Sequence, residues 1–373
     1  MASDASFFTI FLFFIYTYGL GFTITSFVKN SENFLERSLM RIGIGLAVLP
    51  FLGIVLSFFK IPLDWRLFLA LSIIYPAVYL AKNFKKLKFE FKPTNYHLVI
   101  GLMLLIFFFT FYMYSKGSFG YPYFEDDDPW SHAIGVKYVS VQKTVFPDKE
   151  TAAHIQYISP YPPSYDLLLG ILHQTSSSVM WTLKFFNSLI ISMSVIFFFF
   201  FVRQFTNSKN KALYSAFVLA MLPAYLSHFI WAIALTVPLY FVGFYCAERI
   251  PEDKKWFIPA GIVAASILTI SPSHSAYYGF FYALYFISKT IMERRFLSYH
   301  FFAGAIGVAM SFFFWWRVMI RTYGLDEMLS SIGVGGIGIL SVGGSGDRPY
   351  MPGDFIFAKS QNLINSPDRK SVV

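Results

Sequence analysis

Long apolar runs separated by short polar segments dominate the first third of the chain. Four such runs precede its most acidic stretch, at about Ser6–Val28, Leu39–Phe59, Trp65–Ala81 and Tyr96–Ser115. Each is close to the roughly 17–25 residues that an α-helix needs to cross the hydrocarbon core of a bilayer. The pattern therefore predicts membrane-spanning helices.

The second half of the chain contains two more full runs, Met180–Phe201 and Phe301–Ile320. The apolar segments between them are shorter and flank two breaks, LPAYLSHF and SPSHSA; these segments are Ala212–Leu222, Ile230–Tyr245, Phe257–Ile270 and Ala276–Ile287. Irregular backbone at membrane depth is tolerated only where protein or a water-filled cavity surrounds it. We therefore expect an all-α polytopic transmembrane protein of roughly 9–11 spans, with a cavity near the breaks.

Three prolines, Pro160, Pro162 and Pro163, precede another apolar segment, Ser164–His173. Because proline disrupts helix interiors, we expect no regular helix at the three prolines. The segment Ser164–His173 is too short to cross a bilayer. It could lie at the membrane interface or form the first half of a broken span.

Composition excludes a soluble domain and a nucleic-acid-binding role. Of the 373 residues, 56% are hydrophobic and only 14% are charged. The net charge of +9 resides mostly in short loops between apolar runs, where membrane orientation explains it. A single cysteine, Cys246, rules out a disulfide framework and a cysteine-based metal site. The N-terminal run lacks the features of a cleaved signal peptide, so we interpret it as a retained span.

The distribution of lysine and arginine predicts the orientation of the chain. The segment Lys82–Lys92 carries five lysines against a single acid, Glu90, and is expected to be cytoplasmic under the positive-inside rule. The following span then places the acidic stretch outside. Basic turns at Arg249–Lys255 and Lys289–Arg295 place both breaks outside as well. We expect a multi-pass protein of the plasma membrane.

The acidic stretch lies in the outer segment, within GYPYFEDDDPWSH. It holds four successive acids, Glu125, Asp126, Asp127 and Asp128, followed by Pro129 and His132. Because Asp favours the N-cap and Pro the first helical position, Asp128 is expected to cap a helix from Pro129 to about Val141. Asp128 and His132 would then lie one turn apart, where they could hold a divalent cation or move a proton. A solvated acidic loop is the simpler alternative.

The run EDDDPWSH, followed about thirty residues later by YPPSYDLLLGIL, resembles the GT-C superfamily of integral-membrane glycosyltransferases. The D-P-W-x-H form from Asp128 to His132 is most similar to the catalytic subunit of oligosaccharyltransferase, particularly the archaeal form. The resemblance covers roughly Tyr96–Ile320. The second acidic motif of that family has no counterpart here, because the break LPAYLSHF offers only His228.

The resemblance implies an enzyme that uses a sugar donor linked to a polyprenyl (dolichyl) phosphate or diphosphate. In that family the acid of the first external loop binds a divalent cation such as Mg²⁺ or Mn²⁺, contacts the acceptor, or acts as a base. Asp128 occupies the matching position and Asp126 completes a D-x-D pattern, so both are candidate metal ligands. Asp126 and His132 are expected to support Asp128, and Glu125 and Asp127 are further candidates.

The resemblance also implies that the chain is divided into three parts. Residues 1–95 are expected to form three additional transmembrane helices, and residues 96–321 a GT-C-like core with an external acidic loop at 116–162. Residues 322–373 are rich in glycine and are expected to form a mobile external loop. We expect the chain to be a fragment that lacks a C-terminal domain.

Several basic residues and histidines near the outer side are candidate ligands for the donor. Lys184, Arg317 and Arg321 lie near the predicted outer ends of their spans and could contact the donor phosphate. Lysine snorkelling and contacts with lipid headgroups are the alternatives. His228 and His274 occupy the two breaks and could be packing residues or part of the catalytic face.

The leading hypothesis is a membrane glycosyltransferase that moves a sugar or oligosaccharide from a polyprenyl-linked donor on the extracytoplasmic face. Its partners would be the lipid-linked donor, membrane lipid, and a protein, glycan or lipid acceptor, with no nucleic acid. A transporter is an alternative, although transporters usually carry internal repeats that are not evident here. A non-catalytic protein that binds lipid-linked sugars is a third.

Overall fold

The computed structural model describes residues 3–83, 94–152, 154–155, 157–222 and 229–322. All regular elements within these ranges are helices: α1 (Ser3–Thr25), α2 (Phe34–Phe58), α3 (Trp65–Asn83), α4 (Asn95–Gly120), α5 (Asp127–Gln142), α6 (Lys149–Ala152), α7 (Ser164–His173), α8 (Val179–Thr206), α9 (Lys209–Met221), α10 (Ile233–Arg249), η3 (Lys254–Trp256), α11 (Phe257–Ile267), α12 (Pro272–Glu293) and α13 (Ser298–Thr322). The all-α prediction is confirmed for these residues. The Gly-rich segment predicted to be mobile lies outside them.

Six of the described helices, α1, α2, α3, α4, α8 and α13, are long and apolar enough to cross a membrane. This agrees with a helical membrane protein, but the number is smaller than the roughly 9–11 spans expected. The difference arises between α8 and α13. There α9, α10 and α11 have only 13, 17 and 11 residues, and α12 has 22 residues but is not among the helices apolar enough to span. An 11-residue helix is only about 16 Å long, about half the thickness of the hydrocarbon core.

Two of the long helices form the centre of the bundle. In α8, 83% of the spanning window is buried, and in α2, 72%. The windows of α3, α4 and α13 are only 11%, 28% and 28% buried. Because their exposed side chains are mainly apolar, these three helices present the surface that a lipid bilayer would cover.

Close backbone contact joins α1 and α2. A Cβ atom at Gly45 would lie 1.7 Å from the carbonyl oxygen of Thr17, so a larger residue could not occupy this position without moving a helix. Small residues at such crossings let membrane helices approach closely, where van der Waals packing stabilises them.

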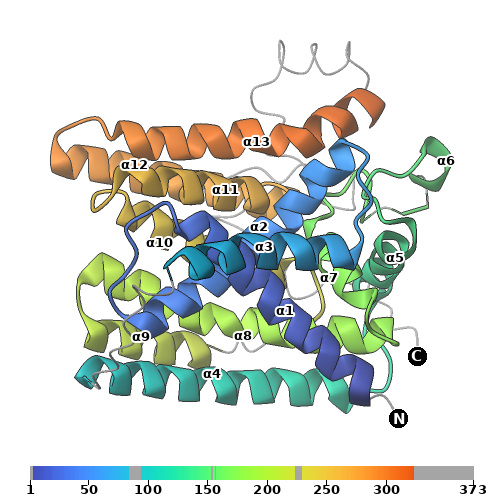
Figure 1. Cartoon of the computed structure of the whole chain (residues 1–373), viewed down its shortest axis with the longest axis horizontal. Coiled ribbons are helices and arrows are strands. Elements are labelled where there is room, and N and C mark those ends of the chain that lie inside the picture. Colours follow the sequence, from blue (N-terminus) through green and yellow to red (C-terminus); the bar gives the residue numbers. More distant parts are fainter. Residues whose placement is uncertain (1–2, 84–93, 153, 156, 223–228, 323–373) are drawn as a thin grey trace, which may run out of the picture. The chain divides into compact units, whose positions relative to one another are not determined.

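The short helices α5, α6 and α7 gather at one end of the bundle, where α4 ends and α3 begins (Figure 1). The Lys143 ammonium pairs with the Asp64 carboxylate between α2 and α3, and the Leu63 amide donates to the Lys143 carbonyl at 2.8 Å. The Lys143 ammonium holds the pKa of Asp64 below its usual value. Helix α7 begins and ends at the residues predicted, Ser164 and His173, after the non-helical proline segment.

Helix α4 provides a direct test of orientation, because it connects the lysine-rich segment to the acidic stretch. In a Cys246→Ala background, cysteines placed at positions 85 and 127 should react with a membrane-impermeant thiol reagent from opposite sides of intact vesicles. We expect position 85 to be labelled only after permeabilisation of right-side-out vesicles. Labelling of both positions from the same side would contradict the topology.

Candidate functional site

The helix that follows the acidic stretch begins two residues earlier than predicted, at Asp127, and Asp128 is not its cap. Asp126 is the N-cap, with an extended backbone and a side chain that accepts from the Asp127 amide at 2.8 Å. Pro129 therefore occupies the third helical position, still within the first turn, where its missing N–H costs nothing. Three successive aspartates make equally good caps by type, so the sequence pattern did not determine which of them would be used.

Asp128 is half-buried, and its Oδ1 accepts a hydrogen bond from the hydroxyl of Tyr157. Tyr157 lies in the non-helical segment between α6 and α7 and was not singled out from the sequence. Burial, and secondarily the bond to Asp128, raise the pKa of Tyr157 well above its ordinary value. Tyr157 therefore remains a hydrogen-bond donor at neutral pH.

His132 pairs with a residue that sequence reasoning missed. Its Nδ1 lies 2.7 Å from Oδ1 of Asp166 on α7, and the two side chains are only 2% and 1% exposed. The expected direct association of His132 with Asp128 is therefore replaced by a buried contact between α5 and α7. Burial raises the pKa of Asp166 above its ordinary value, while the neighbouring imidazole opposes that shift. The available signal was an acid within an apolar run, SYDLLLGIL.

A glycine permits this contact. A Cβ atom at Gly135 would lie 2.1 Å from Oδ2 of Asp166, so a larger residue would push the carboxylate away from the helix. Gly170 has the same role on the facing helix, where a Cβ atom would lie 2.6 Å from the Cβ of Val139. The two glycines allow α5 and α7 to approach closely around the buried pair.

Three tyrosine rings surround the pair and connect it to a predicted break. The rings of Tyr157 and Tyr165 lie 4.3 and 4.9 Å from the His132 imidazole, and the Tyr161 ring lies 5.0 Å from that of Tyr157. The Tyr161 side chain is hydrogen-bonded to Ser271, in the break SPSHSA. The break before α12 therefore lies beside the segment before α7.

His274 belongs to the same break, in the first turn of α12. Its Nδ1 lies 3.1 Å from Oγ of Ser271, which places it near Tyr161 through a shared partner. A second link runs from Ser164 Oγ to Thr269 Oγ1 at 2.8 Å. The other candidate histidine, His228, lies outside the described residues.

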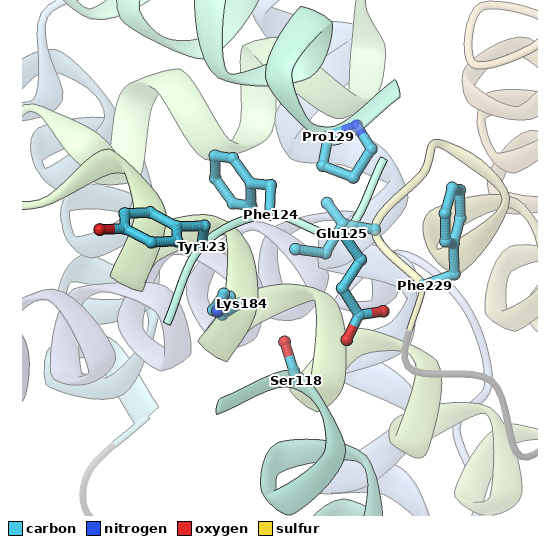
Figure 2. A pocket seen from close by; sticks show the side chains of 8 residues that line it. Ser118, Tyr123, Phe124, Glu125, Pro129, Lys184 and Phe229 are labelled. Atoms are coloured by element: carbon cyan, nitrogen blue, oxygen red, sulfur yellow. The ribbon is translucent and has the colours of Figure 1, made fainter. Parts of the chain in front are cut away.

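Glu125 and Lys184 border a narrow cavity beside the start of α5 (Figure 2). Its lining residues are Ser118, Tyr123, Phe124, Glu125, Pro129, Lys184, Phe229 and Ile230. Its volume is about 10 Å³, enough for about one water molecule and too small for a phosphate. The Lys184 ammonium donates to the carbonyl of Tyr121, the C-cap of α4, and so stabilises the end of that helix.

Arg317 does not join Asp128. Its guanidinium lies over the ring of Phe146 at 4.6 Å, just beyond the end of α5. At 1.5 Å per residue, the part of α5 that follows Asp128 is about 20 Å long, so Arg317 lies by the opposite end of the helix. Arg321 is in α13, and its side chain is not among those described.

The side chains that could ligate a metal ion give only limited support for a metal site. Within the part of the chain that the structure describes, no three His, Cys, Asp or Glu side chains form a group that could hold one. Asp126 is exposed and used as a cap, and Asp128 accepts from Tyr157. Mg²⁺ often binds through one or two carboxylates together with substrate phosphates. A cation here would therefore depend on oxygens from the substrate.

Comparisons with known proteins do not assign the chain to a family. A scan against family models, and searches of curated proteins and of solved structures, each returned no match to the chain.

Proposed function

We propose that the protein is a membrane glycosyltransferase that moves a sugar or oligosaccharide from a polyprenyl (dolichyl) phosphate-linked donor to an acceptor on the outer face of the plasma membrane. The observation that supports this most is the half-buried Asp128, which lies among tyrosines beside membrane helices and next to a buried His–Asp pair. A solvated acidic loop would not place a carboxylate in such an enclosure.

The membrane supplies the chemical reason for this location. A polyprenyl tail stays in the bilayer, so the bond between phosphate and sugar reaches a catalyst only at headgroup level. Helix α5 lies between the end of the spanning helix α4 and the start of the spanning helix α8, which is consistent with that level. An acid there can accept the acceptor's proton or help to bind a cation.

In this proposal Asp128 is the base or cation ligand, and Asp126 and His132 support it. Lys184 is a better candidate for the donor phosphate than Arg317 or Arg321, because it borders the same cavity as Glu125 and Pro129. Phosphate would reach Lys184 only if the lining of this narrow cavity moved. Tyr123 and Glu125 are exposed, so these lining side chains could move without disturbing buried packing.

The test is consumption of dolichyl-phosphate hexoses by the purified protein in liposomes, with a membrane extract supplying acceptors. We expect radiolabelled hexose to leave the dolichyl carrier and to appear in an acceptor fraction. Adding EDTA and then Mg²⁺ or Mn²⁺ shows whether a cation is required. Movement of intact dolichyl-phosphate hexose across the liposome membrane, without cleavage, would indicate a transporter instead. Tight binding without cleavage would indicate a non-catalytic protein.

A further inference from the structure

Among the residues that the structure describes, the buried His132–Asp166 pair has no other ionic partner to balance it. Oδ1 of Asp166 contacts Nδ1 of His132, and Oδ2 is buried with no hydrogen-bond partner among the described residues. A carboxylate in such a position is costly unless an adjacent positive charge or a bound proton compensates it. The pair is therefore most stable when its two side chains together carry no net charge.

Two arrangements of protons satisfy this condition without placing a hydrogen on Oδ2 of Asp166, which has no partner to accept it among the described residues. In the first, an imidazolium faces a carboxylate, and both ring nitrogens carry hydrogen. In the second, a carboxylic acid donates to Nδ1 of a neutral imidazole, and the ring hydrogen lies on Nε2. Both arrangements put a hydrogen on Nε2 of His132. The pair is thus organised as a hydrogen-bond donor rather than as a base.

We propose that His132 uses its Nε2–H to bind an oxygen of an anionic phosphate, with Asp166 as the residue that positions the imidazole. The assignment of that phosphate to the donor rests on the proposed function. During transfer, the acceptor oxygen or nitrogen bonds to the sugar C1, and the bond from C1 to the phosphate oxygen breaks. The electron pair stays on that oxygen, which the Nε2–H stabilises. The acceptor's proton passes to Asp128.

Neutral side chains face the pair from the neighbouring segments, together with the Asp128 carboxylate. Tyr157 and Tyr161 face it from the segment before α7, and burial raises the pKa of both. Tyr165 faces it from α7 itself, and burial likewise raises its pKa. Helix α8 contributes the neutral Asn187, bonded to Tyr165 at 2.8 Å. The other segments that pack on α7 also contribute neutral groups. Gly53 of α2 lies against Leu167, and Thr269, which follows α11, is hydrogen-bonded to Ser164.

Tyr157 is one of two tyrosines whose rings contact the His132 imidazole. The Tyr157 ring packs against His132, and its hydroxyl is held by Asp128. Tyr157 belongs to a non-helical segment, so displacing it requires no helix to unwind. An acceptor that replaces Tyr157 at Asp128 would free this ring and open the route to Nε2.

Nitrogen-15 NMR of the histidine rings tests the proton arrangement without any transfer assay. The signal of His132 is identified by its loss in His132→Gln. We expect Nε2 to carry hydrogen at pH 7, and dolichyl monophosphate to shift this signal. His300→Gln is the matched control, because His300 is equally buried on α13, and this change should leave the His132 signal and its response unaltered. A bare Nε2 at pH 7, or no response to dolichyl monophosphate, would overturn the proposal.

The kinetics of Asp166→Asn give a second readout. This change removes the carboxylate that positions the imidazole. We expect kcat to decrease about tenfold or more with little change in KM for the sugar donor. An unchanged kcat would contradict the positioning role of Asp166. If wild-type protein transfers nothing but His132 still responds to dolichyl monophosphate, the proposed transfer fails and the phosphate contact stands.

Discussion

Asp128→Asn should lower sugar transfer about a hundredfold or more while leaving the melting temperature nearly unchanged, as expected for the loss of a catalytic carboxylate. Asparagine keeps an oxygen that can accept from Tyr157, so the observed contact survives. The cap of α5 is also preserved, because it is supplied by Asp126. What disappears is the negative charge that a proton or a hard cation requires. The measurement is transfer from dolichyl-phosphate hexose, with a melting curve for each variant.

Asp127 is the matched control for this experiment, and Asp126→Asn tests the supporting role of Asp126. Asp127 is exposed, so Asp127→Asn should reduce transfer far less. Asp126→Asn retains a good N-cap and should remain stable, since Asn and Asp cap helices almost equally well. If Asp127→Asn is inactive while Asp128→Asn is fully active, our choice of catalytic residue is wrong. If none of the three changes affects transfer, the acidic stretch is only a solvated loop.

The largest effect on stability should come from a second buried acid, far from Asp128 in the sequence. Glu36 on α2 is 0% exposed. It accepts from Arg203 Nη1 at 2.8 and 2.7 Å, from the Tyr96 hydroxyl at 2.9 Å and from the Tyr245 hydroxyl at 3.1 Å. These partners come from α8, α4 and α10, so one carboxylate connects four helices.

Arg203→Met should destabilise the protein by about 3–5 kcal/mol, because it leaves the buried Glu36 carboxylate without its cation. Glu36→Gln should cost less. The side chain of Arg203 is 32% exposed and can recover hydration, and glutamine still accepts a hydrogen bond. Unfolding of each variant in detergent, followed by circular dichroism, measures the difference.

The double variant Glu36→Gln with Arg203→Met separates charge from packing. Because no charge is then left unpaired, it should be more stable than Arg203→Met alone. Equal stability of the double variant and Arg203→Met would show that the loss comes from packing of the long arginine side chain. Greater damage from Glu36→Gln than from Arg203→Met would contradict the argument.

The pattern of apolar residues was sufficient to determine the helices. It predicted the all-α class, the spanning helices and the bounds of α7, because apolar length and proline position act locally along the chain. It predicted more spans between α8 and α13 than the structure has helices long and apolar enough to form them. Three of these helices have 11, 13 and 17 residues, and the 22-residue α12 is not apolar enough. In α10 and α11 the apolar residues are mostly buried inside the bundle, and the sequence pattern does not distinguish this burial from burial in a bilayer.

The composition of the candidate site was decided by packing. The sequence identified Asp128 and His132 through their spacing on one helix, but their actual partners lie 29 and 34 residues further along the chain. Asp166 reaches His132 because Gly135 lets α7 approach α5, and Tyr157 reaches Asp128 from the segment before α7. Helical periodicity relates residues within one element, whereas contacts between elements depend on which faces meet and how closely. That information becomes available only when the helices are packed together.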